Sequence, residues 1–91
     1  MARARARTAA LDRAADELAG VRGRASSPGG EAEAVVDGRG GLASLWLAES
    51  VGRRPPAEIG ALIVDTAQAA ALDAMRRRQE AIADLVADLG R

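Results

Sequence analysis

Arginine is the residue type with the clearest chemistry in this 91-residue sequence, and that chemistry is phosphate binding. All 13 cationic side chains are arginine. A guanidinium group carries several N–H donors in a planar fork that matches the oxygens of a phosphate group. Two clusters are candidates for contact with a phosphate backbone: Arg3, Arg5 and Arg7 near the start, and Arg76, Arg77 and Arg78 farther along.

The first cluster, Arg3, Arg5 and Arg7, can be interpreted in two ways. Side chains at every second residue spread around a helix and do not share one face. In an irregular segment they would instead form a flexible basic arm, and each phosphate contact would add to an affinity that falls as salt rises. A solvated terminus, enriched in arginine by a GC-rich coding sequence, is the alternative.

The second cluster covers nearly a full helical turn, so at most two of Arg76, Arg77 and Arg78 can face one direction. Asp73 stands four residues before Arg77, a spacing that permits an ion pair within a helix. Arg76 and Glu80 stand at the same spacing. The cluster is therefore either a solvated, internally paired helix face or a contact with DNA.

Enzymatic and metal chemistry find little support in the composition. There is no cysteine or histidine, which removes the usual general base, the commonest transition-metal ligand and every Ser–His or Cys–His pair. Lysine and tyrosine are absent as well, so we expect no enzyme activity and no cofactor. Three acids, Glu31, Glu33 and Asp37, share one strand face, but no second ligand cluster accompanies them and we expect no metal site.

The charge is balanced overall but uneven along the chain. The 13 cations meet 13 anions, a balance that argues against a strongly basic, sequence-blind polyanion binder. Residues 1–30 nevertheless carry six arginines and three acids, a local charge of +3. No run approaches the roughly 18 apolar residues of a membrane span. We therefore expect a cytoplasmic protein without membrane contact.

Two helices and a small sheet are expected to position these side chains, in one α+β domain over residues 1–91. The first helix is expected within residues 1–20, which are rich in alanine, and Gly20 is its expected terminator. Its narrow apolar side has four members at helical spacing: Thr8, Leu11, Ala15 and Leu18.

A three-stranded antiparallel sheet is expected within residues 21–49. Residues 21–25 alternate weakly, as in an edge strand. In residues 31–37, alanine and valine alternate with acids, which is typical of a half-buried strand. An Asp-Gly turn and the glycines after it predict a hairpin, and residues 42–48 are the return strand.

The second helix is expected over residues 55–89, because proline suits the first helical turn. Its stripe toward the sheet is Ile59, Leu62, Ile63, Thr66, Ala70 and Ala74. Such a helix is on the order of 50 Å long, against about 17 Å for a short strand. Its end therefore projects beyond the sheet and carries four apolar residues: Ile82, Leu85, Val86 and Leu89. We expect a second copy of the chain to cover them.

Trp46 is the only aromatic residue in the sequence, and it points away from Leu45 and Leu47 on the return strand. Stacking of single-stranded bases needs several aromatic platforms, so RNA recognition of that type is excluded. Tryptophan is enriched at interface hot spots. We expect Trp46 to anchor an interface with the dimer partner or with another protein, and simple partial burial is the alternative.

Several runs form a pattern whose order and spacing are hard to reproduce by chance. They are residues 34–40 (Ala-Val-Val-Asp-Gly-Arg-Gly), Leu42 with Leu45-Trp46-Leu47, residues 63–70 (Ile-Val-Asp-Thr-Ala-Gln-Ala-Ala) and residues 72–78 (Leu-Asp-Ala-Met-Arg-Arg-Arg). Through them, the chain from about Val21 to Arg78 resembles the YbaB/EbfC family of bacterial nucleoid-associated DNA-binding proteins. Arg53-Arg54-Pro55 is similar to the actinobacterial members in particular.

The resemblance implies a homodimer in which two sheets join and two pairs of helices project like the arms of tweezers. It also implies that DNA is bound by the first helix and the distal part of the last helix. Carried onto this sequence, the DNA-binding positions are Arg3, Arg5, Arg7, Arg13, Arg76, Arg77 and Arg78. Trp46 departs from the family, which commonly has a charged or polar residue there, and so do the acids Asp84 and Asp88 in the final turns.

These observations favour a non-catalytic protein of the bacterial nucleoid. We expect it to bind double-stranded DNA as a homodimer, with little sequence preference, through arginine–phosphate contacts. The alternative is a protein-interaction module that keeps the fold without strong DNA binding, since actinobacterial relatives occur beside secretion systems as accessory proteins. The zero net charge, the acidic helix end and Trp46 favour this alternative.

Overall fold

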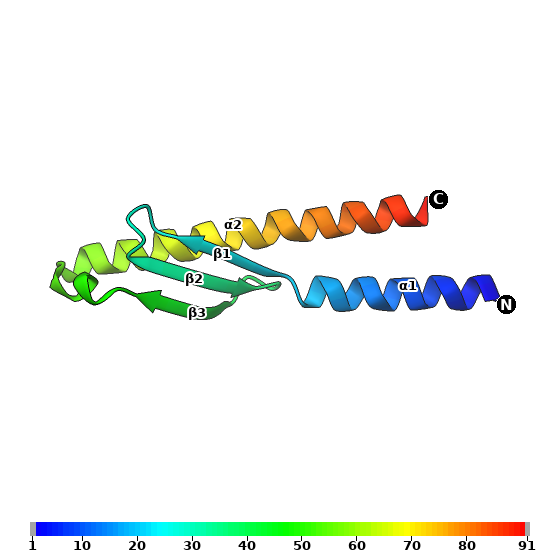
Figure 1. Cartoon of the computed structure of the whole chain (residues 1–91), viewed down its shortest axis with the longest axis horizontal. Coiled ribbons are helices and arrows are strands. Elements are labelled where there is room, and N and C mark those ends of the chain that lie inside the picture. The colour runs from blue at the N-terminus through cyan, green and yellow to red at the C-terminus, as the bar shows by residue number, and fades with distance from the viewer. Residues whose placement is uncertain (1, 91) are drawn as a thin grey trace.

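Two helices and one small sheet make an elongated molecule whose principal extents are 64 × 17 × 16 Å. This computed structural model describes residues 2–90, with side chains from residue 8 onward. The elements in chain order are α1 (Ala2–Ala19), β1 (Arg22–Ser26), β2 (Ala32–Asp37), β3 (Leu42–Leu47), the short 3-10 helix η1 (Glu49–Arg53) and α2 (Pro56–Leu89) (Figure 1). A helix, three antiparallel strands and a long second helix confirm the predicted α+β fold.

β2 lies at the centre of the sheet, between the antiparallel strands β1 and β3. Its inward residues Ala32, Ala34 and Val36 are buried, whereas Glu33 is exposed. This confirms the alternation that the sequence predicts. Because most inward side chains are small, a helix backbone can lie close to this face of the sheet.

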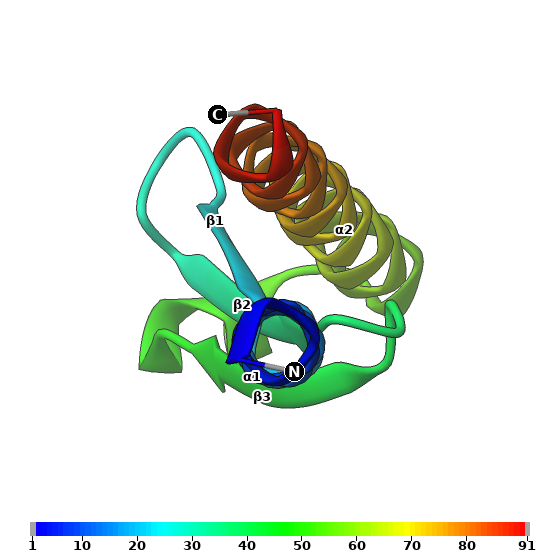
Figure 2. The ribbon, with the colours of Figure 1, turned by 90° about the vertical axis from the view of Figure 1, so that its right-hand side faces the viewer.

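The proximal half of α2 covers that inner face (Figure 2). Thr66, Ala70 and Ala74 are buried there, in agreement with their predicted place in the stripe. A Cβ atom on Gly23 of β1 would lie only 2.1 Å from the carbonyl oxygen of Ala70. Only glycine fits at this position, so α2 lies directly on the backbone of β1.

The short helix η1 connects β3 to α2 and was not predicted from the sequence. Val51 in η1 is 2% exposed, so it anchors the connection in the interior. Arg54, just after η1, forms an ion pair with Glu31 at the start of β2. A single short 3-10 turn has no periodicity long enough to be detected in a sequence.

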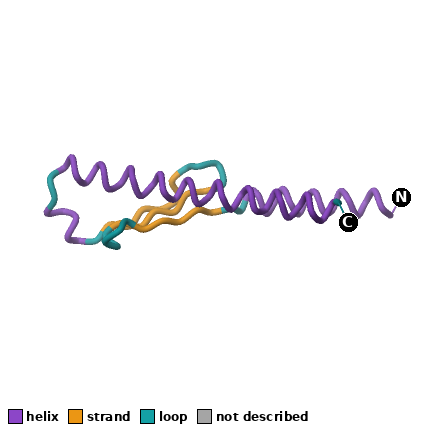
Figure 3. Tube along the Cα trace, turned by 90° about the horizontal axis from the view of Figure 1, so that it is seen from above, coloured by secondary structure: helices purple, strands orange, loops and turns teal. Residues whose placement is uncertain are grey.

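Beyond the sheet, α1 runs antiparallel to the distal part of α2, and we call this pair of helices the arm (Figure 3). The side of α1 toward α2 carries Ala10, Ala14 and Leu18, which are partly buried. Leu11, which was expected on that side, is 49% exposed, and Ala15 is exposed as well. The expectation was wrong for Leu11 and Ala15, because the side toward α2 instead carries Ala10 and Ala14 together with the expected Leu18.

α2 also carries large apolar side chains that face solvent, and we call them the apolar seam. They are Leu72, Met75, Ile82, Val86 and Leu89, with exposed fractions of 66, 59, 40, 63 and 48%. Leu85 is partly buried on the side toward α1, and Leu89 lines the same hollow between the two helices. The expectation that a second chain covers all four distal residues stays a prediction, and α1 already gives Leu85 part of its cover. Among the described residues, neither helix is apolar enough over a sufficient length to cross a membrane.

Candidate nucleic-acid interface

The arginines of α1 occupy two situations. Arg3, Arg5 and Arg7 lie in the helical part of α1, but their side chains are outside the part of the chain that the structure describes. Arg13 lies on the arm, where its Nε donates to the carbonyl oxygen of Ala9 at 3.4 Å. The backbone of all four arginines is therefore part of the arm, and their role in DNA binding stays a prediction.

A hollow of about 270 Å³ separates α1 from the distal part of α2, and we call it the arm groove. Its charged lining residues are Arg13, Glu17, Asp84 and Asp88. One cation against three anions gives this lining a formal charge of −2. Arg13 therefore lies in an acidic environment, which disfavours the approach of a phosphate backbone along this groove.

Arg76 and Arg77 both bind Asp73, which is fixed by β1. The carboxylate accepts hydrogen bonds from Arg76 at 2.5 Å, from Arg77 at 2.9 Å and from the backbone N–H of Arg24 at 2.9 Å. The Arg24 N–H is the main cause that lowers the pKa of Asp73 to about 2, followed by the side chain of Arg77.

The predicted pair of Asp73 with Arg77 is present, but Arg76 does not pair with Glu80. Arg76 reaches back to Asp73 instead, because that carboxylate is already oriented by β1. The guanidinium groups of Arg76 and Arg77 remain exposed to solvent. Two cations share one anion here, so this helix face keeps a charge of +1.

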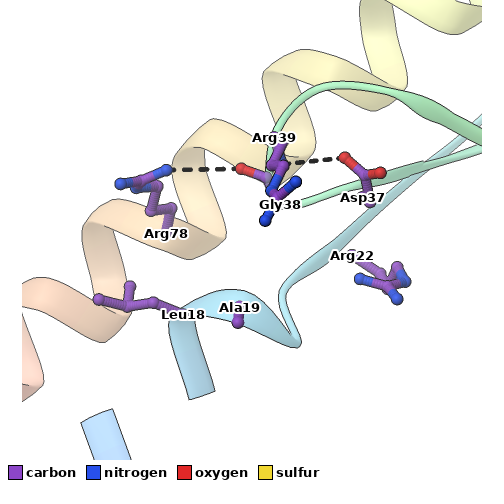
Figure 4. Close-up of a pocket in the computed structure, with 7 residues that line it drawn as sticks. All are labelled: Leu18, Ala19, Arg22, Asp37, Gly38, Arg39 and Arg78. Atoms are coloured by element: carbon purple, nitrogen blue, oxygen red, sulfur yellow. Dashed lines mark hydrogen bonds between the residues drawn. The ribbon is translucent and has the colours of Figure 1, made fainter. Parts of the chain in front are cut away.

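Arg78 belongs to a different environment, at the junction of α1, α2 and the β2–β3 hairpin. Its Nη1 donates to the carbonyl oxygen of Gly38 at 3.5 Å. A hollow of about 380 Å³ opens here, and we call it the basal hollow (Figure 4). Its charged lining residues are Arg22, Asp37, Arg39 and Arg78. Of these residues, Arg78 was predicted as a binding residue, whereas Arg22 and Arg39, which lie far from it along the chain, were not.

Asp37 stabilises the hairpin turn at the rim of this basal hollow. Its Oδ1 accepts the backbone N–H groups of Arg39 and Gly41, both at 2.9 Å. These bonds, with that of Gly41 first, lower the pKa of Asp37 below its ordinary value, and the nearby charges of Arg22 and Arg39 act in the same direction. The carboxylate therefore stays ionised, and the lining has a formal charge of +2.

The outer face of the sheet presents Trp46, which is 54% exposed and pairs in register with Glu33. Leu45 and Leu47 on the opposite face are partly buried, as predicted. The acids on and just before β2 form ion pairs: Glu31 binds Arg54, and Glu33 lies 4.0 Å from Arg24.

Comparison with known proteins adds one match. A family model described as the YbaB/EbfC DNA-binding family matches residues 1–89. No curated protein and no solved structure matches the chain.

Proposed function

Since the chain belongs to the YbaB/EbfC DNA-binding family, which is non-catalytic, we propose that it binds double-stranded DNA as a homodimer with little sequence preference. The observation that carries this proposal is the family match over residues 1–89, which agrees with the resemblance found in the sequence. We further propose an actinobacterial-type member that acts in the cytoplasm, on the nucleoid.

Arginine–phosphate contacts are the proposed source of affinity, from Arg3, Arg5, Arg7, Arg13, Arg76, Arg77 and Arg78. The exposure of the Arg76 and Arg77 side chains supports this assignment, at 70 and 56%. A phosphate can bind these guanidinium groups without displacing Asp73, since each guanidinium has several N–H donors. Such contacts do not read the bases, which accounts for the low sequence preference.

The apolar seam supports the proposed homodimer. From Leu72 to Leu89, with Gln79 included, its positions alternate at spacings of three and four, the pattern of a helix that packs along another helix. Complete burial of a large apolar side chain contributes roughly 2 kcal/mol, so covering five half-exposed ones stabilises a dimer by several kcal/mol. Trp46 on the open face of the sheet offers a second contact surface.

A protein-interaction module is the second candidate function. The acidic arm groove and the 54% exposure of Trp46 favour it, because an exposed tryptophan beside an ion pair is a typical anchor for a protein partner. In this case the fold of the family would be kept while strong DNA affinity was lost.

A salt series of DNA binding distinguishes the two candidates. Fluorescence anisotropy with a labelled duplex of about 30 base pairs should show binding at about 50 mM salt that weakens steeply towards about 200 mM. No binding at the lower salt concentration would contradict the DNA proposal and favour the interaction module. Light scattering on the same samples should return the mass of a dimer.

A further inference from the structure

The arginines in the described part of this chain divide into those that are paired with an acid and those that are not. Among the described residues, acidic oxygens lie within 4.0 Å of Arg24, Arg54, Arg76 and Arg77. No such oxygen lies within that distance of Arg22, Arg39 or Arg78 in the described part of the chain. These three unpaired arginines come from β1, the hairpin and α2, yet they line one cavity (Figure 4).

The net field in the basal hollow favours an anion. Its three arginines and Asp37 sum to a formal charge of +2. The carboxyl end of α1 also opens here, at Leu18 and Ala19, and contributes at most about half a negative charge. The sum remains positive by more than one charge, so neither Asp37 nor the helix end neutralises the cavity.

The walls of the basal hollow are held in place mainly by contacts of the backbone, and Arg78 and Arg22 each donate only one guanidinium N–H to a backbone carbonyl, of Gly38 and of Val21. A Cβ atom on Gly38 would lie 2.9 Å from the carbonyl oxygen of Leu18, so the hairpin lies directly against the end of α1. The Asp37 carboxylate closes the turn through the N–H groups of Arg39 and Gly41. The three arginines are therefore carried by a preformed scaffold, which lowers the entropic cost of binding a ligand.

We propose that the basal hollow is a phosphate-binding site, in which Arg22, Arg39 and Arg78 enclose one phosphate group. The volume of about 380 Å³ accommodates a hydrated phosphate, since one water takes roughly 30 Å³ of liquid volume. Planar guanidinium groups from three directions suit the tetrahedral array of oxygens. On duplex DNA this site anchors a backbone phosphate at the base of the arm, a step that rests on the proposed function.

The salt dependence of duplex binding tests this anchor. Each phosphate contact contributes about 0.9 to the slope of log Kobs against log salt concentration. Arg22→Gln and Arg39→Gln should each reduce the slope, and the Arg22→Gln/Arg39→Gln variant should reduce it by about 0.9, or by about 1.8 in a dimer that uses both hollows. Arg39→Lys, which keeps the charge, should retain the slope. Arg53→Gln is the matched control, because Arg53 is exposed, unpaired among the described residues and at the other end of the sheet.

Equal slopes for Arg39→Gln, Arg22→Gln and Arg53→Gln would overturn the anchor while leaving DNA binding intact. A titration with inorganic phosphate at matched ionic strength, followed by the amide NMR signals of Gly38 and Arg39, tests the site without DNA. Saturable shifts that disappear in the Arg22→Gln/Arg39→Gln variant are expected. If the protein shows these shifts but binds no duplex, the site binds free phosphate, and only the DNA proposal is refuted. If a titration with chloride gives the same NMR shifts as phosphate, the hollow does not bind phosphate specifically and the proposed site is refuted.

Discussion

The basal hollow lies at the carboxyl end of α1 and the arm groove runs along its side, yet they carry opposite charge. The basal hollow has three arginines and one acid, and the arm groove has one arginine and three acids. A family-based expectation places DNA along the arm, whereas the positive field of the described side chains is concentrated where the arm meets the sheet. The local balance of charge, not the number of arginines in a helix, decides where a phosphate is stabilised.

The two regions also differ in how they are held together. At the sheet, α2 lies on β1 with a separation that only glycine permits, whereas in the arm α2 leaves Ile82, Val86 and Leu89 of the apolar seam exposed. The proximal region is therefore built to keep its geometry within one chain. The distal region carries the surface that a second chain would cover.

The largest expected effect comes from breaking the proximal packing. Gly23→Val places a side chain where a Cβ atom alone would lie 2.1 Å from the Ala70 carbonyl oxygen, and we expect a loss of at least about 3 kcal/mol in the free energy of unfolding. Urea denaturation measures it. Gly60→Ala is the control, because open space surrounds Gly60 in α2 and alanine should add up to about 1 kcal/mol of helix stability. Equal stability of the Gly23→Val protein would refute the close packing.

A charge on the apolar seam tests the distal region. Val86→Glu buries an unpaired carboxylate in a seam-to-seam dimer, at a cost of several kcal/mol, so self-association should weaken at least about 100-fold. Sedimentation at a series of protein concentrations measures this change. Ala87→Glu adds the same charge to the neighbouring exposed position on another side of α2 and should leave association unchanged. If both variants dimerise equally well, the seam is not the interface.

Much of the fold could be predicted because it depends on local patterns. The alternation in residues 32–37 and the long apolar period of α2 each lie within one stretch of sequence. Gly23, in contrast, looks like any strand glycine until α2 is placed over it. The partner of Arg76 was missed for the same reason, since β1 rather than the helix orients Asp73.

The candidate site was less predictable than the fold. Arg78 stood out in the sequence as part of an unbroken run, but its neighbours Arg22 and Arg39 come from other elements. The strand register places Arg22 opposite Asp37, beside the hairpin that carries Arg39. The packing of α2 on the sheet then brings Arg78 to the same hollow. Both are long-range consequences of folding, so no local motif could reveal the cluster.

A smaller effect is expected from removing the negative charge of the arm groove. Asp84→Asn with Asp88→Asn changes the formal charge of its lining from −2 to 0. If DNA lies along the arm, duplex affinity at low salt should rise about 3- to 10-fold, at roughly 0.3–0.7 kcal/mol per exposed charge. Anisotropy titrations against the unaltered protein measure it. Unchanged affinity would place the arm away from the DNA and leave the basal hollow as the main contact.

The smallest effect concerns Asp73, which lies on the border between the two regions. Its folded pKa of about 2 is below the ordinary value of 3.8, so the ionised carboxylate stabilises the fold above about pH 4. This contribution is lost as the pH falls through 4 towards 2, because protonation then weakens the bonds to Arg24, Arg77 and Arg76. Thermal unfolding between pH 2 and 5 should therefore show a flatter pH dependence for Asp73→Asn than for the unaltered protein. Asp65→Asn, an exposed position on the same helix, is the control and should retain the original dependence. If Asp73→Asn retains it as well, β1 is not held to α2 through this carboxylate.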